Sequence, residues 1–176
     1  MIAFAVVLFF SITGITLNHP TWVFGSKPHE SSVTGVLPAS TMKGKEVDWL
    51  ALSEYFRNVR GVHGAVSDKR LDNGDGSITY KSPGYEADAF FKVPSGTYRL
   101  SVQGQGFLGV INDLHKGRDV GRSWKWLIDL SAGFLILISL SGLTMQFFLR
   151  KRRRRAFTTA TVGTVILAIA TWFTVR

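Results

Sequence analysis

The sequence predicts a membrane protein with three transmembrane α-helices and an extracytoplasmic α+β domain inserted between the first and second. Three windows nearly free of charged residues carry the first half of this prediction: Met1–Asn18, Leu130–Leu149 and Ala156–Val175. Each is close to the roughly 20 residues that a helix needs to cross a hydrocarbon core ~30 Å thick. The second half rests on the region between the first two windows, where acidic and basic residues nearly balance as in an ordinary soluble domain.

A run of six basic residues, Arg150–Arg155, sets the predicted orientation. The net charge of +9 would suggest a nucleic-acid partner in a soluble protein, but this run lies between two apolar windows, which is typical of a cytoplasmic anchor. We therefore expect a multi-pass protein with lipid, not nucleic acid, as its surroundings. The expected segments are a first helix at 1–18, an extracytoplasmic domain with linkers at 19–122, a second helix at 123–149, a cytoplasmic loop at 150–155 and a third helix at 156–175.

The first window is interpreted as a retained helix, because it lacks a basic leader and a small-x-small cleavage site. The segment Ser11–Leu17 (SITGITL) matches Ser139–Met145 (SLSGLTM) in kind at every position. Small residues let membrane helices approach closely, so Gly14 and Gly142 are predicted at helix contacts. Chance similarity between two apolar helices is the alternative. If the repeat is real, its copies are inverted across the bilayer, and we expect a complete first copy to carry a basic lead-in before Met1.

The region between the first two windows contains one predicted helix and a predicted sheet. Residues 19–45 are rich in Pro, Gly, Ser and Thr and are interpreted as a linker or short strands. Apolar spacing in Val47–Arg60 predicts an amphipathic helix ended by Gly61. Four alternating runs, separated by turn signals, then predict an antiparallel meander; they are Gly64–Leu71, Ser77–Ser82, Glu86–Val93 and Thr97–Gln103. The turn at 72–76 fails the calcium-loop pattern and is predicted to be a hairpin turn.

Candidate chemistry is confined to two histidines, since we find no hydrolase, nucleotide-binding or zinc-protease motif. The absence of cysteine excludes disulfides and thiolate metal sites. His19 ends the first window and His115 precedes the second, so both are expected near the outer membrane surface. Imidazole is a natural axial ligand of haem iron, and Lys116, Arg118 and Arg122 are candidates to neutralise haem propionates. The alternative is a pair of polar boundary residues with basic neighbours. The other two histidines, His29 and His63, are predicted to be surface residues.

The blocks Gly109–Arg118 (GVINDLHKGR), Trp124–Leu130 (WKWLIDL) and Ser11–His19 (SITGITLNH) together resemble the PepSY-associated transmembrane family. The predicted helix and meander are similar to a PepSY domain. This resemblance implies a bacterial inner-membrane protein that binds haem b and passes electrons across the membrane, in some members to reduce ferric siderophores outside. By position, His115 and His19 correspond to histidines of the family pattern. The basic, His-bearing segment that usually precedes the family's first helix is missing from this sequence.

Two functions therefore follow from the sequence. The first is haem b-dependent transmembrane electron transfer that supports extracytoplasmic ferric, siderophore or other metal reduction. Its electron donor would be a flavoprotein or other redox partner, because the chain has no flavin or nicotinamide fingerprint. The alternative is a non-enzymatic, membrane-anchored PepSY module that binds or regulates an extracytoplasmic partner. A peptidase inhibitor, which the family name suggests, has no support from individual residues, and the sequence does not indicate an oligomeric state.

Overall fold

The computed structural model describes residues 2–19, 21–22, 27–43, 46–148 and 153–175. The chain divides into two compact units, Met1–Ile128 and Asp129–Arg176. The first unit contains the sheet and the shorter helices, and the second contains the apolar windows on either side of the basic run.

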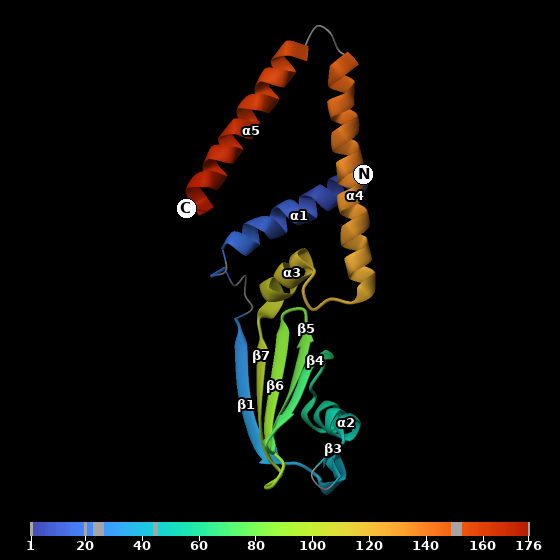
Figure 1. The fold of residues 1–176 in the computed structure, drawn as a ribbon, viewed down its shortest axis with the longest axis vertical. Helices are drawn as coiled ribbons and strands as arrows, with labels where there is room; N and C mark the ends of the chain where they lie inside the picture. The colour runs from blue at the N-terminus through green and yellow to red at the C-terminus, as the bar shows by residue number, and fades with distance from the viewer. Residues whose placement is uncertain (1, 20, 23–26, 44–45, 149–152, 176) are drawn as a thin grey trace. The chain divides into compact units, whose positions relative to one another are not determined.

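A five-stranded antiparallel sheet in the order β1-β7-β6-β5-β4 forms the centre of the first unit (Figure 1). Four strands follow one another as the predicted meander, namely β4 (Ala65–Asp72), β5 (Asp75–Ser82), β6 (Tyr85–Lys92) and β7 (Thr97–Gly104). The fifth strand, β1 (His29–Val36), pairs with β7 along its whole length. The interpretation of residues 19–45 as a linker or short strands missed this full edge strand, because its partner lies far away in the sequence.

Each hairpin of the meander turns where the sequence predicted. Asn73 and Gly74 both have positive φ (50° and 89°) between β4 and β5, as expected for an Asn-Gly hairpin turn. Gly84 at the next turn has φ 67°, and Gly96 at the last has φ 66°. Glycine adopts these values without a steric penalty, so the three turns that set the register of the meander are confirmed.

One helix, α2 (Trp49–Arg60), covers one face of the sheet. The Asp48 side chain accepts hydrogen bonds from the backbone N–H groups of Leu50 and Ala51, which caps the helix start. Gly61, with φ 67°, ends the helix as predicted. Short elements precede it: η1 (Ala39–Thr41), β2 (Met42–Lys43) and β3 (Glu46–Val47).

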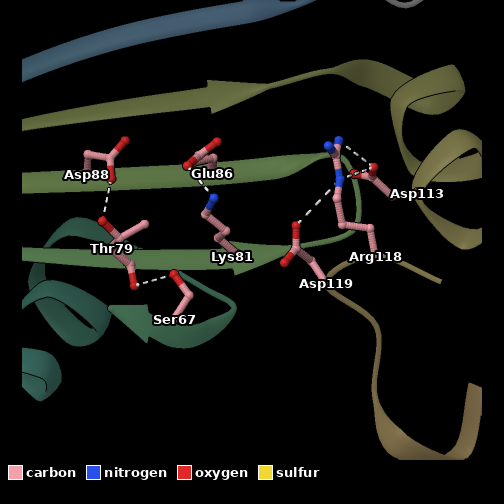
Figure 2. A network of polar contacts seen from close by, with 8 residues as sticks. All are labelled: Ser67, Thr79, Lys81, Glu86, Asp88, Asp113, Arg118 and Asp119. Carbon is pink, nitrogen blue, oxygen red and sulfur yellow. Dashed lines mark hydrogen bonds and ion pairs between the residues drawn. The ribbon is translucent and has the colours of Figure 1, made fainter. Parts of the chain in front are cut away.

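The hydrophobic core lies between α2 and the sheet. Leu52 and Phe56 of α2 are fully buried, and the Phe56 ring packs edge-to-face on Tyr98 at 5.2 Å. Buried residues alternate along β5, β6 and β7, as a half-covered sheet requires; they include Ile78, Tyr80, Ala87, Ala89, Phe91 and Leu100. The opposite face carries polar pairs such as Thr79–Asp88 (2.6 Å) and Lys81–Glu86 (2.8 Å), shown in Figure 2.

Four further helices complete the chain: α1 (Ile2–Asn18), α3 (Gly106–Lys116), α4 (Arg122–Phe148) and α5 (Arg153–Val175). Among the described residues, two segments are long and apolar enough to cross a membrane, Arg122–Met145 and Phe157–Thr174. The apolar part of α1, Ala3–Asn18, is shorter, so the structure does not confirm the expected three transmembrane helices.

The boundaries of the last two helices also differ from those expected. Residues 150–152 of the predicted cytoplasmic loop lie outside the described residues. The rest of the basic run is helical, because α5 already begins at Arg153. Arginine and lysine are good helix formers, so a basic run is compatible with the first turns of a helix.

Candidate functional site

The candidate site lies where α3 packs against α1. A positive φ of 69° at Gly106 turns the chain out of β7 into α3, and Gly117 (φ 65°) ends the helix by donating its N–H to the carbonyls of Asp113 and Leu114. Asn112 and His115 are three residues apart and so project from the same face of α3. This helix was not predicted from the sequence, where residues 106–116 fall within the expected domain with linkers at 19–122.

The face of α1 that meets α3 is its stripe of small and hydroxyl residues. The Thr16 hydroxyl donates to Asn112 Oδ1 at 2.9 Å, and Thr13 Oγ1 is hydrogen-bonded to His115 Nδ1. Both threonines are buried: Thr13 is 3% exposed and Thr16 is 7% exposed. A Cβ placed at Gly14 would lie 3.9 Å from His115 Cε1, so Gly14 is at a helix contact as predicted. The corresponding prediction for Gly142 stays a prediction.

The hydrogen bonds of Thr13 define the tautomer of His115. A threonine hydroxyl has a single hydrogen, and that of Thr13 is donated to the Phe9 carbonyl oxygen at 2.7 Å. With that hydrogen assigned to Phe9, Thr13 Oγ1 accepts a hydrogen bond from Nδ1–H of His115. In the neutral ring this leaves Nε2 with its lone pair, ready to bind a metal or accept a proton.

The charge state of His115 agrees with this arrangement. Burial against α1 and the neighbouring Lys116 ammonium both lower the pKa of His115 below its ordinary value. The Phe10 ring packs edge-on against the imidazole, with 5.0 Å between ring centroids. His115 is thus a neutral, oriented imidazole at the junction of an apolar helix and the sheet domain.

Asp113, two residues before His115 in α3, anchors the helix to the β5–β6 turn. Its carboxylate is only 5% exposed and accepts from the backbone N–H of Gly84 at 2.8 Å. Arg118 binds the other carboxylate oxygen through Nη2 at 2.8 Å and Nε at 3.0 Å (Figure 2). The Arg118 guanidinium, predicted to face a haem propionate, is therefore already paired within the protein.

The remaining predicted site residues are His19, Lys116 and Arg122, of which Lys116 directly follows His115. His19 is exposed and stacks on Trp22, with centroids 4.3 Å apart and planes 9° apart. It lies nearly two helical turns beyond Thr13, roughly 9 Å along the axis of α1. Lys116 and Arg122 are exposed at the end of α3 and the start of α4. The described residues contain no cluster of three metal-ligating side chains.

The other two histidines lie away from this contact. His29 begins β1 and is exposed, and the exposed His63 stacks on Tyr85 at 3.6 Å. The sequence analysis identified His115 but not the partners that orient it, Thr13 and Asn112. One sequence signal could have indicated these partners: the polar face of Asn112 and His115 matches the threonine stripe of the apolar helix α1.

The described chain carries an antiparallel sheet domain ahead of two helices that are long and apolar enough to cross a membrane. Comparison with protein families identifies the group. The PepSY_TM-like family model matches residues 1–176, the whole chain, and the protein belongs to this family. No curated protein and no solved structure gives a significant match.

Proposed function

We propose that this protein is a membrane component of haem b-dependent electron transfer in which His115 supplies an axial ligand. The observation that carries the proposal is the hydrogen bond between Thr13 Oγ1 and His115 Nδ1, which leaves Nε2 as the nitrogen available for ligation. Haem-binding and metal-binding histidines are commonly oriented in this way by a hydrogen bond at the second ring nitrogen. When bound, the haem supplies one-electron redox chemistry.

The residues of the chain fit one axial position. His115 has the donor chemistry for it, whereas His19 is stacked on Trp22 and is not next to His115 in the described residues. Of the basic residues, Lys116 and Arg122 are exposed and available to propionates, while Arg118 stabilises the Asp113 anchor. Under this proposal the second ligand is His19 after a rearrangement of the end of α1, or a group from outside the described residues.

The proposed location is the bacterial inner membrane, with residues 20–122 extracytoplasmic and 150–155 cytoplasmic. Electrons from a flavoprotein or similar donor would reach a ferric, siderophore or other metal substrate on the outer side. Reporter fusions near Asp75 and after Arg155 test this topology. We expect the first fusion to behave as extracytoplasmic and the second as cytoplasmic, and the reverse pattern would contradict the proposed direction of electron flow.

A reduced-minus-oxidised absorption spectrum of the full chain purified in mild detergent tests the haem proposal. We expect a Soret and an α-band that are lost in His115→Ala and retained in the matched control His63→Ala. Thr13→Val, which removes the hydrogen bond to Nδ1, should weaken haem retention, whereas Thr13→Ser should restore it. The absence of bands in the wild-type protein rejects haem binding, and bands that survive in His115→Ala reject the ligand assignment.

The alternative is a non-enzymatic module in which the sheet domain binds a partner and the helices anchor it. The open edge of the sheet, described below, favours this candidate. The same spectrum separates the two functions, because a binding module needs no chromophore.

A further inference from the structure

The two edges of the five-stranded sheet differ in their protection against pairing with another strand. Edge strands are normally protected by charges, bulges or proline. The β4 edge has this protection, because its register shifts between Val66 and Asp68 and half of its residues are charged, namely Asp68, Lys69, Arg70 and Asp72. The β1 edge lacks this protection. Strand β1 is eight residues long, pairs with β7 without a register shift, and contains a single Asp, Glu, Lys or Arg residue, Glu30.

A hollow of about 730 Å³ lies beside the second half of β1. Thr34 and Val36 form its border on β1, and Phe90, Lys92 and Arg99 line it from the inner strands. The large apolar side chains here are open to solvent, with Val36 66% exposed and Phe90 58% exposed. These side chains lie on the polar face of the sheet, which α2 does not cover, and they offer an apolar surface directly next to the unprotected edge.

The charges along this edge are divided between its two ends. Asp75 stands opposite Lys92 in the register and offsets its charge. Arg99 stands between Thr34 and Phe90 in the same cross-strand row, and it has no ion-pair partner among the described residues. Glu30 lies at the start of β1. An added strand would therefore meet a carboxylate at one end of β1 and a guanidinium at the other.

A second copy of this chain paired in parallel and in register does not suit the β1 edge. The start of β1 pairs with Gly104, so it lies at the end of the sheet that continues into α3 and α4. Antiparallel pairing of two β1 strands is the competing arrangement, and the oligomeric state of the chain tests it. Parallel pairing in register would bring two Glu30 carboxylates together, and like charges on adjacent strands are destabilising.

We propose that β1 binds an extended segment of a partner protein by antiparallel strand addition. The segment places an acidic side chain opposite Thr34, within reach of Arg99, and a basic side chain opposite Glu30. Its backbone pairs with the outer side of β1, and an apolar side chain packs on Val36. Main-chain hydrogen bonds supply affinity in such complexes and alternate side chains supply specificity. This interaction is independent of haem binding.

Two labelled peptides of identical composition test the proposal against the full chain in detergent. In antiparallel register, Val-Thr-Glu-Val-Thr-Thr-Lys sets its glutamate opposite Thr34 and its lysine opposite Glu30, and Val-Thr-Lys-Val-Thr-Thr-Glu exchanges them. We expect the first to bind about tenfold more tightly by fluorescence anisotropy, from two favourable charge pairs against two unfavourable ones. The double variant Glu30→Lys, Arg99→Glu should invert the preference, and Lys69→Glu on β4 should leave it unchanged.

Hydrogen exchange of the same complexes locates the bound peptide. Strand addition predicts slower exchange over residues 29–36 and no change over 65–72. Equal binding of the two peptides, no binding of either, or protection of 65–72 in place of 29–36 overturns the proposal. A dimer of the chain that the peptide dissociates would also overturn it, by identifying a second copy as the occupant. All three substitutions replace exposed side chains, and an unchanged circular dichroism spectrum confirms that both variants fold.

Discussion

Asp113→Ala tests whether the α3 helix is fixed to the sheet through one buried carboxylate. The substitution leaves the backbone N–H of buried Gly84 without its acceptor, which costs about 1–3 kcal/mol. It also removes the ion pair with Arg118, whose side chain is 56% exposed, so that solvent screening limits this contribution to less than about 1 kcal/mol. We expect a loss of about 2 kcal/mol in the free energy of unfolding, most of it from the unsatisfied Gly84 N–H.

Urea unfolding of the full chain in detergent, followed by tryptophan fluorescence, measures this loss. Asp113→Asn keeps an oxygen acceptor for Gly84 and should cost no more than about 1 kcal/mol. Asp119→Asn is the matched control, because Asp119 is 3.9 Å from Arg118 and has a positive φ of 55° that asparagine also tolerates. A loss below about 0.5 kcal/mol in Asp113→Ala, or an equal loss in Asp113→Asn, would refute the reasoning.

Three further predictions concern the turn, the core and the α1–α3 contact. Gly84→Ala should destabilise the domain by at least about 2 kcal/mol, because the new methyl group would lie 2.6 Å from Val110 Cγ2 at a residue with positive φ. Thermal unfolding measures this loss, and an unchanged stability would contradict the packing of α3 on the Gly84 turn. Phe56→Ala should cost about 3–5 kcal/mol by leaving a cavity under Tyr98, and Phe56→Leu clearly less in the same assay. The pKa of His115 in the folded chain is lowered from its ordinary value of 6.5. The unfolded chain therefore binds more protons than the folded chain as the pH falls below about 6.5, and the free energy of unfolding decreases with falling pH. Hydrogen exchange over residues 106–116, corrected for the intrinsic rate, should therefore be faster at pH 5.5 than at pH 7.5, and His115→Asn should remove the difference.

The elements that the sequence predicted well are those with local signals. The α2 helix has its cap at Asp48 and its stop at Gly61, and the hairpin turns have Asn73-Gly74 and Gly84 at the positions that need positive φ. Such residues act on the backbone within a few positions, so they identify an element without knowledge of its neighbours.

The elements that were missed depend on contacts distant in sequence. Strand β1 is rich in Ser and Thr, and its pairing with β7 determines its structure. The α3 helix begins at Gly106, two residues after Gly104, and contains Gly109; these glycines weaken the helix signal in the sequence, which does not show the packing on α1. For the same reason the sequence identified His115 as a candidate haem ligand but assigned Arg118 to a haem propionate. In the folded chain Arg118 is paired with Asp113.

The hydrogen bond between Thr13 and His115 joins residues 102 positions apart, and this separation has a consequence for biogenesis. At typical synthesis rates of about 5–20 residues per second, α1 emerges on the order of 5–20 seconds before the histidine that it holds. During that interval its hydroxyl stripe has only its own helix backbone as a hydrogen-bond partner, while the hairpins of the sheet form from neighbouring residues. The α1–α3 contact is therefore expected to close last, so the nascent protein assembles its candidate site only after the sheet domain has been translated.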